Sequence, residues 1–315
     1  MAFDALLGND RLKQNLAESL AKNHISHFYL ISGPRGSGKK TLAALLAQAI
    51  LCQGRPKPCG VCEPCRKLKN GNHPDFITVE DPEHKNVAVK IVRAFREDVF
   101  IRPNESDYKI YLFPQDLGVE GQNALLKILE EPPKYGIFLL LTDNPEKILP
   151  TVRSRCTELK MQALPQSQLR TYLSARFPET AAEDVAAAAQ RSGGFLGQAL
   201  ELLESGGAVP PQAEALVQAL CSRDPLLLTE TLVPMEKWKR DALADILQSW
   251  LELAEEALAS RSGRPALSPQ ARSLSQARTP ADLLAISRSL KKAHSYTMGN
   301  VSPAAVCGWL VWQLR

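Results

Sequence analysis

The chain has 315 residues, and at about 100 to 200 residues per domain this length predicts two or three domains. Hydrophobic residues make up 44% and charged residues 23%, which excludes a wholly disordered chain and a fibrous repeat. A net charge of +4 does not by itself indicate a nucleic-acid-binding protein. Because no apolar run reaches about 18 residues and the amino-terminal segment lacks a secretory signal pattern, we expect a cytoplasmic protein with no membrane partner.

The first 164 residues alternate short apolar runs with amphipathic helical patterns. This order is typical of βαβ units around a mainly parallel sheet flanked by helices, so we predict an α/β domain over residues 1–164. The expected strands are 28–32, 76–80, 109–113, 137–142 and 157–160. The expected helices between them are 39–51, 87–100 and 120–131.

Beyond Leu164 the strand signals disappear, and leucine- and alanine-rich helical runs follow one another. We predict a small helical lid domain over 165–206 and an all-α C-terminal domain over 207–315. The breaks between helices are expected at Gly193-Gly194, Gly206-Gly207, Pro210-Pro211 and a loop at 260–269.

A glycine-rich segment joins the first strand to the next helix and has the pattern G-x-x-x-x-G-K. In this strand-to-helix setting the pattern is a phosphate loop, because the glycines let backbone N–H groups turn toward a phosphate and the lysine neutralises its oxygens. The candidate nucleotide-binding residues are Gly33, Gly36, Gly38, Lys39 and Thr41.

The magnesium ligands of this loop are altered. Lys40 stands where a serine or threonine hydroxyl normally binds Mg²⁺, and Thr41 comes one residue late, about 100° further around the helix. The strand at 109–113 is not followed by an acidic pair, and Asp116 is a candidate substitute. Both changes affect the same metal, so the sequence argues against ATP hydrolysis by this chain and leaves nucleotide binding open.

Four cysteines lie within a loop at residues 52–65, with the spacing C-x6-C-x2-C-x2-C. Four thiolates close a tetrahedral zinc site without an open position, so Cys52, Cys59, Cys62 and Cys65 predict a structural Zn²⁺ site. An iron–sulfur cluster, a redox pair and unmetalled thiols are the alternatives. Basic residues around the cysteines are compatible with a solvated surface or with DNA contact.

The segments 123–133, 137–142 and 151–156 together resemble bacterial clamp-loader subunits of the AAA+ ATPases. The last of them contains Ser154-Arg155-Cys156, and the resemblance implies that Arg155 is an arginine finger, which reaches the ATP site of a neighbouring subunit. Residues 193–200 are similar to the second sensor helix of these subunits, with Gly197 where active subunits carry an arginine. Residues 142–144 occupy the place of the first sensor.

The resemblance implies a non-motor subunit that helps to load the sliding clamp onto primed DNA. Its expected partners are the other clamp-loader subunits, of the gamma or tau motor type and the delta type, in a hetero-pentamer whose collar includes the C-terminal domain. An apolar surface near Trp309 and Trp312 is expected to be buried in that collar. Two alternatives remain open: an active gamma-type ATPase, and a zinc-dependent DNA-binding module.

Overall fold

The computed structural model describes residues 3, 5–84, 86–204, 211–262, 268–299 and 301–315. The chain divides into two compact units, Met1–Glu204 and Ser205–Arg315. The breaks expected at Gly206-Gly207 and Pro210, and residues 263–267 of the loop expected at 260–269, lie outside the described residues. Within the described ranges, none of the helices has both the length and the apolar character needed to cross a membrane.

The first unit contains the predicted parallel sheet. Its strands are β1 (Phe28–Ser32), β2 (Phe76–Thr78), β3 (Lys109–Phe113), β4 (Gly136–Thr142) and β5 (Thr157–Lys160). They pair in the order β2-β3-β4-β1-β5, and every pairing is parallel. Strands β1, β3 and β4 are buried along their whole length, as their continuous apolar runs require. The α/β fold predicted from the sequence is therefore confirmed.

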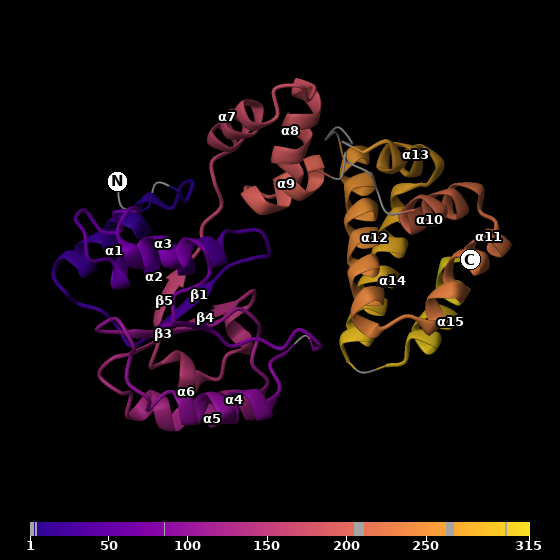
Figure 1. Cartoon of the computed structure of the whole chain (residues 1–315). Helices are drawn as coiled ribbons and strands as arrows, with labels where there is room; N and C mark the ends of the chain where they lie inside the picture. The colour runs from indigo at the N-terminus through magenta and orange to yellow at the C-terminus, as the bar shows by residue number, and fades with distance from the viewer. Residues whose placement is uncertain (1–2, 4, 85, 205–210, 263–267, 300) are drawn as a thin grey trace. The chain divides into compact units, whose positions relative to one another are not determined.

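Helices cover both faces of this sheet (Figure 1). One face carries α1 (Asp10–Ala21), α2 (Lys39–Leu51) and α3 (Glu63–Lys69). The other carries α4 (Val89–Asp98), α5 (Val119–Glu130) and α6 (Pro150–Arg153), with the short η1 (Pro145–Lys147) before α6.

Successive residues of β1 point to opposite faces of the sheet, and they therefore enter two different cores. Tyr29 and Ile31 pack in the core that contains α2. Phe28 and Leu30 pack in the core that contains α4 and α5. In that second core the rings of Phe28 and Phe138 stack at 4.3 Å between centroids. The sheet thus separates two hydrophobic cores.

A small helical lid completes the first unit, formed by α7 (Gln166–Arg176), α8 (Ala182–Arg191) and α9 (Leu196–Glu204). Its own core is small and includes Leu169, Leu173, Val185 and Ala199.

The described residues of the second unit form helices and their connections, and they include no strand. The unit consists of α10 (Pro211–Ser222), α11 (Pro225–Leu232), η2 (Val233–Lys237), α12 (Arg240–Arg261), α13 (Pro269–Ala277), α14 (Pro280–Met298) and α15 (Pro303–Leu314). Four of these helices start with proline directly after a side chain that accepts a hydrogen bond from the first turn; these capping residues are Asp224, Ser268, Thr279 and Ser302. This combination of cap and proline fixes where each helix begins.

The core of the second unit is built around the fully buried Trp250, with the expected apolar stripes of α12, α14 and α15 packed inside. Trp309 is half-buried and meets Tyr296 edge-on at 5.4 Å between ring centroids. Trp312 is 71% exposed. Of the two tryptophans expected at an apolar surface, only Trp312 is therefore largely exposed, and the burial of this region in a collar stays a prediction.

The structure corrects several expected boundaries. The strand expected at 76–80 ends at Thr78, and the helix expected at 87–100 covers only Val89–Asp98. The region 52–65, expected as a loop, ends inside helix α3, so that Cys65 is helical. Helix α12 extends to Arg261, into the loop expected from residue 260.

Candidate functional site

The phosphate loop lies at the carboxyl end of β1, between that strand and α2. Gly36 and Gly38 have φ angles of 74° and 90°, which favour glycine. The N–H group of Gly33 donates to the carbonyl oxygen of Thr142 at 3.2 Å, and this bond ties the loop to the end of β4. The sequence therefore forms the turn that a phosphate loop requires.

Lys39, the lysine of this loop, is held by three acceptors. Its Nζ lies 2.6 Å from the carbonyl oxygen of Gly33, 2.9 Å from that of Pro34 and 2.5 Å from Oδ1 of Asp143. Only 12% of the lysine side chain is exposed, against 59% of the Asp143 side chain. The ammonium group is therefore folded back onto its own loop and neutralised by a carboxylate of the same chain.

The lid packs directly on the phosphate loop. The N–H group of Gly197 donates to the carbonyl oxygen of Gly36 at 2.8 Å, and the Gln198 side-chain amide donates to the carbonyl oxygen of Arg35 at 3.0 Å. Arg35 also pairs with Glu201 of α9 at 2.9 Å. A Cβ atom at residue 197 would lie 2.6 Å from the Cα of Gly36. Any side chain at residue 197, including the arginine expected there in active subunits, would therefore displace the lid from this contact.

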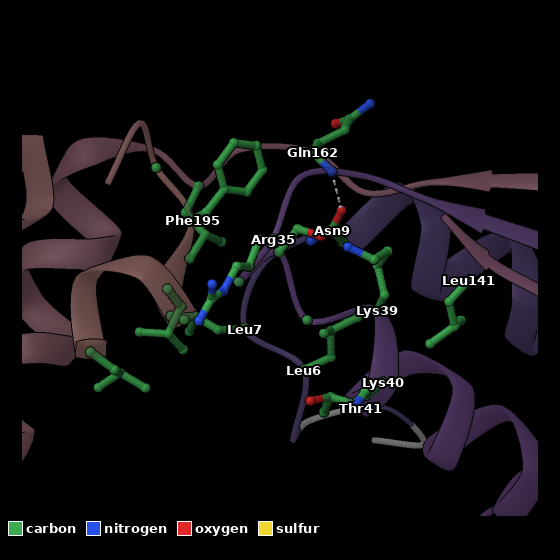
Figure 2. A pocket seen from close by; sticks show the side chains of 18 of the residues that line it. Leu6, Leu7, Asn9, Arg35, Lys39, Lys40, Thr41, Leu141, Gln162 and Phe195 are labelled. Atoms are coloured by element: carbon green, nitrogen blue, oxygen red, sulfur yellow. Dashed lines mark hydrogen bonds between the residues drawn. The ribbon is translucent and has the colours of Figure 1, made fainter. Parts of the chain in front are cut away.

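A cavity of about 450 Å³ lies beside this contact and is lined by the phosphate loop, the amino-terminal segment and the lid. Figure 2 shows Leu6, Leu7 and Phe195 around it, with Asn9 bonded to Gln162. In that bond the backbone N–H of Gln162 donates to Oδ1 of Asn9 at 2.8 Å. The volume falls within the range of small-molecule pockets, about 300 to 1,000 Å³.

The candidate magnesium ligands are placed as follows. Lys40 and Thr41 lie in the first turn of α2, and both are exposed at the edge of the cavity (Figure 2). The carboxylate of Asp116 accepts a hydrogen bond from the Thr142 hydroxyl at 2.9 Å and lies 3.4 Å from Nζ of Lys147. Asp116 is not among the residues that line the cavity. The acidic residue that pairs with Lys39 is instead Asp143.

The family resemblance puts residues 142–144 at the first sensor, but we predicted no contact for Asp143 from the sequence. A signal was nevertheless present, since carboxyl ends of neighbouring parallel strands meet at the same edge of a sheet. Ser32 of β1 and Thr142 of β4 are paired, and the residues that follow both strands are therefore neighbours.

Arg155, the expected arginine finger, lies two residues after the end of α6, and its side chain is 40% exposed. One guanidinium nitrogen donates to the carbonyl oxygen of Thr151 at 2.9 Å, and the other lies 3.4 Å from Oε1 of Glu130. Beneath this segment, the buried side chain of Gln122 donates to the carbonyl oxygen of Lys147 and accepts from the N–H of Leu149. This buried amide fixes the position of α6 relative to α5.

The four cysteines form one cluster, in which all Sγ atoms lie within 4.8 Å of one another. The Sγ atoms of Cys52 and Cys62 are 3.8 Å apart. A tetrahedron of thiolates around zinc, with Zn–S bonds of about 2.3 Å, has edges of about 3.8 Å. These four residues are therefore positioned to bind a metal ion, and their geometry is compatible with structural zinc.

Backbone groups point at the cysteine sulfur atoms. The N–H groups of Gly54 and Cys59 each donate to Sγ of Cys52 at 3.3 Å, and that of Cys62 donates to Sγ of Cys59 at the same distance. A Cβ atom on Gly54 would lie 2.7 Å from Sγ of Cys59, so the turn admits only glycine here. This arrangement stabilises thiolates, the form in which cysteine binds metals.

The thiols differ in their surroundings. Burial would raise the pKa of Cys62, but hydrogen bonds from backbone and from neighbouring thiols lower it to about 6. Burial raises the pKa of Cys65 to about 12. Cys156, outside the cluster, has a pKa raised by burial to about 11, as expected for a packed thiol rather than a nucleophile.

The cysteine helix α3 is joined to the sheet through a network of charged groups. Lys67 pairs with Glu105 at 2.6 Å and with Glu63 at 3.0 Å. The buried carboxylate of Asp75 accepts from the N–H groups of Asn104, Glu105 and Ser106 at 2.6, 2.9 and 2.9 Å. Asp75 thus holds the loop that pairs with the cysteine helix.

The family model described as DNA polymerase III, delta subunit, matches residues 8–165, half of the chain. The chain belongs to this family. Its membership confirms the resemblance to AAA+ clamp-loader subunits that the sequence indicated.

Two curated relatives of this family member illustrate how far the likeness extends. It is 36% identical over 177 residues to DNA polymerase III subunit gamma/tau of Mycobacterium tuberculosis, covering 55% of this chain and 31% of the relative. It is 35% identical over 157 residues to subunit delta' of Bacillus subtilis, covering 49% of this chain and 47% of the relative. The chain therefore spans less than half the length of either relative.

Among solved structures, a DNA polymerase III gamma subunit-related protein from Thermotoga maritima is 18% identical, with a TM-score of 0.44. The match covers 97% of this chain and 99% of that one.

Proposed function

We propose that this chain is the delta-prime subunit of a bacterial DNA polymerase III clamp loader. In this role it is a stator that does not hydrolyse ATP, and it lends Arg155 to the ATP site of a neighbouring motor subunit. Its partners are gamma- or tau-type subunits and delta in a hetero-pentamer, the sliding clamp and, through the complex, primed DNA. It belongs in this way to a DNA-directed DNA polymerase, a nucleotidyltransferase, in the cytoplasm.

The observation that supports this proposal most strongly is the state of the phosphate loop beside an exposed Arg155. Lys39 is neutralised by Asp143, and the residue after it is Lys40 instead of a hydroxyl that binds Mg²⁺. Arg155 carries a guanidinium that is accessible to another chain. A guanidinium supplied in trans stabilises the charge that develops on a transferred phosphoryl group.

We propose that the four cysteines hold a structural Zn²⁺ ion. The donor set is closed, with four thiolates and no position left for substrate, so the ion would fold the segment between α2 and α3 rather than catalyse a reaction.

The test is Mg·ATP turnover by the purified chain alone, at ATP concentrations well above those that saturate motor subunits. We expect no turnover. Clear turnover that disappears in Lys39→Ala would overturn the stator role and make this chain a gamma-type motor. That second candidate function is favoured by the identity of 36% to a subunit named gamma/tau.

A zinc-dependent DNA-binding module is the third candidate, favoured by the exposed Arg55, Lys57, Arg66 and Lys69 around the cysteines. It predicts that the isolated chain binds DNA with a strong dependence on salt concentration, and that neutralising these four residues abolishes this binding. Weak DNA binding that is insensitive to these substitutions would exclude it.

A further inference from the structure

The phosphate loop retains most of the groups that bind phosphate, yet its lysine has no free donor. A lysine ammonium group has three N–H donors. Gly33, Pro34 and Asp143 supply three acceptors at 2.5 to 2.9 Å from Nζ of Lys39. A phosphate group could reach this ammonium only by displacing one of them.

We propose that Asp143 is a specificity-determining residue: its carboxylate acts as a built-in anion for Lys39 and excludes nucleotide phosphate from the phosphate loop. This inference rests on the proposed non-motor function and gives it a mechanism that is separate from the lost magnesium ligand.

The position of Asp143 is fixed by the residues on both sides. Thr142, before it, accepts the Gly33 N–H through its carbonyl oxygen, and its hydroxyl donates to Asp116. Asn144, after it, donates its backbone N–H to the Thr142 hydroxyl oxygen at 3.2 Å. The carboxylate is thus held beside Lys39 by the sheet, and it need not be ordered by a ligand.

Charge explains why this arrangement excludes phosphate. An incoming phosphate meets a carboxylate at the lysine that should attract it, and like charges at such short range repel each other. An asparagine at this position keeps the shape of the side chain and removes the charge, so its hold on Lys39 weakens and it no longer repels phosphate.

The loop otherwise remains suited to an anion. Ser37 lines the cavity, and its hydroxyl is buried without a hydrogen-bond partner among the described residues. A buried hydroxyl without a partner is costly, and a bound anion oxygen would satisfy it. Under this proposal, the pairing of Lys39 is what keeps phosphate out, whereas the loop itself keeps its form.

The experiment compares binding of ATP and of inorganic tripolyphosphate to the full chain by calorimetry, with Mg²⁺ and with EDTA. For Asp143→Asn we expect affinity for both probes to rise about tenfold or more over the unchanged chain. Asp143→Ser should show the same gain. Adding Lys39→Ala to Asp143→Asn should remove it. Glu146→Gln neutralises an exposed carboxylate in η1, three residues further on, and should leave affinity unchanged.

The proposal would be overturned by no gain in either Asp143 variant when circular dichroism shows both folded, by an equal gain in Glu146→Gln, or by a gain for ATP without one for tripolyphosphate. None of these contradicts the stator role, which fails only if the unchanged chain turns over ATP. Tight binding of tripolyphosphate by the unchanged chain would likewise overturn the exclusion without implying turnover.

Discussion

The guanidinium of Arg155 lies 3.4 Å from the carboxylate of Glu130, although 25 residues separate them in sequence. Both groups are well exposed, and exposed ion pairs contribute only about 0 to 1 kcal/mol. The pair therefore holds the arginine only weakly, which is compatible with the proposed role of Arg155 at a neighbouring subunit.

Replacing Arg155 with alanine should leave assembly of the complex intact and reduce ATP-driven clamp loading by about tenfold or more, since arginine fingers accelerate phosphoryl transfer strongly. Loading is measured with the reconstituted complex, and assembly by gel filtration. Arg153→Ala is the matched control, because Arg153 lies in the same turn and pairs with Glu158 of its own chain at 2.9 Å. Unchanged loading with Arg155→Ala would exclude the finger.

Removing one cysteine of the cluster should release the metal and destabilise the first unit. We expect Cys65→Ser to lower the free energy of unfolding by about 2 kcal/mol or more, because a structural zinc site contributes directly to folding. Atomic absorption should find one zinc per chain before the change and none after it. Cys221→Ser, outside the cluster, should retain the metal. A full zinc content in Cys65→Ser would contradict the four-thiolate site.

Asp75 should make stability depend on pH. Burial would raise the pKa of its carboxyl, but backbone N–H groups of Asn104, Glu105 and Ser106 lower it below the usual value. The folded pKa lies below the unfolded value of about 3.9, so the stabilisation is present above about pH 4 and is lost as pH falls through the folded pKa.

Asp75→Asn should therefore reduce stability by about 2 kcal/mol at pH 7, and the difference from the unchanged chain should shrink below pH 4. Thermal unfolding midpoints at pH 7 and pH 3 measure both effects. The exposed Asp107, near the same loop, supplies the control Asp107→Asn. A constant difference at both pH values would show that the ionised carboxylate is not what stabilises the loop.

Gly197 should be intolerant of any side chain. Its missing Cβ would lie 2.6 Å from Gly36, so Gly197→Ala should loosen the lid, with faster hydrogen exchange in α9 and a lower thermal midpoint. Gly308→Ala, in the open surface of α15, meets nothing within 4 Å and should stabilise its helix by about 0.5 to 1 kcal/mol. Unaltered exchange in α9 of Gly197→Ala would contradict the tight contact.

The parts of the fold that the sequence predicted are those with a strong local signal. Strands β1, β3 and β4 are continuous apolar runs, and the four-cysteine spacing identified a cluster positioned to bind a metal without any knowledge of the fold. Helix α3 was missed because it is short and begins at Glu63-Pro64 inside a segment that reads as a turn.

The contacts that sequence reasoning missed join residues far apart in the chain. The pairing of Lys39 with Asp143 depends on the order of strands in the sheet, which periodicity does not reveal. The contact between Gly36 and Gly197 depends on how the lid docks. The members of each pair lie far apart in the sequence, and only the fold brings them into contact.

The two cores on opposite faces of the sheet also bear on how such a subunit can evolve. Helix α2, which follows the phosphate loop, packs in one core, whereas α5 and α6, which support Arg155, pack against the other. If the proposed non-motor role holds, substitutions that erode ATP chemistry at the phosphate loop need not disturb the core that supports Arg155. The two properties can then be lost or kept separately, because they depend on opposite faces of one sheet.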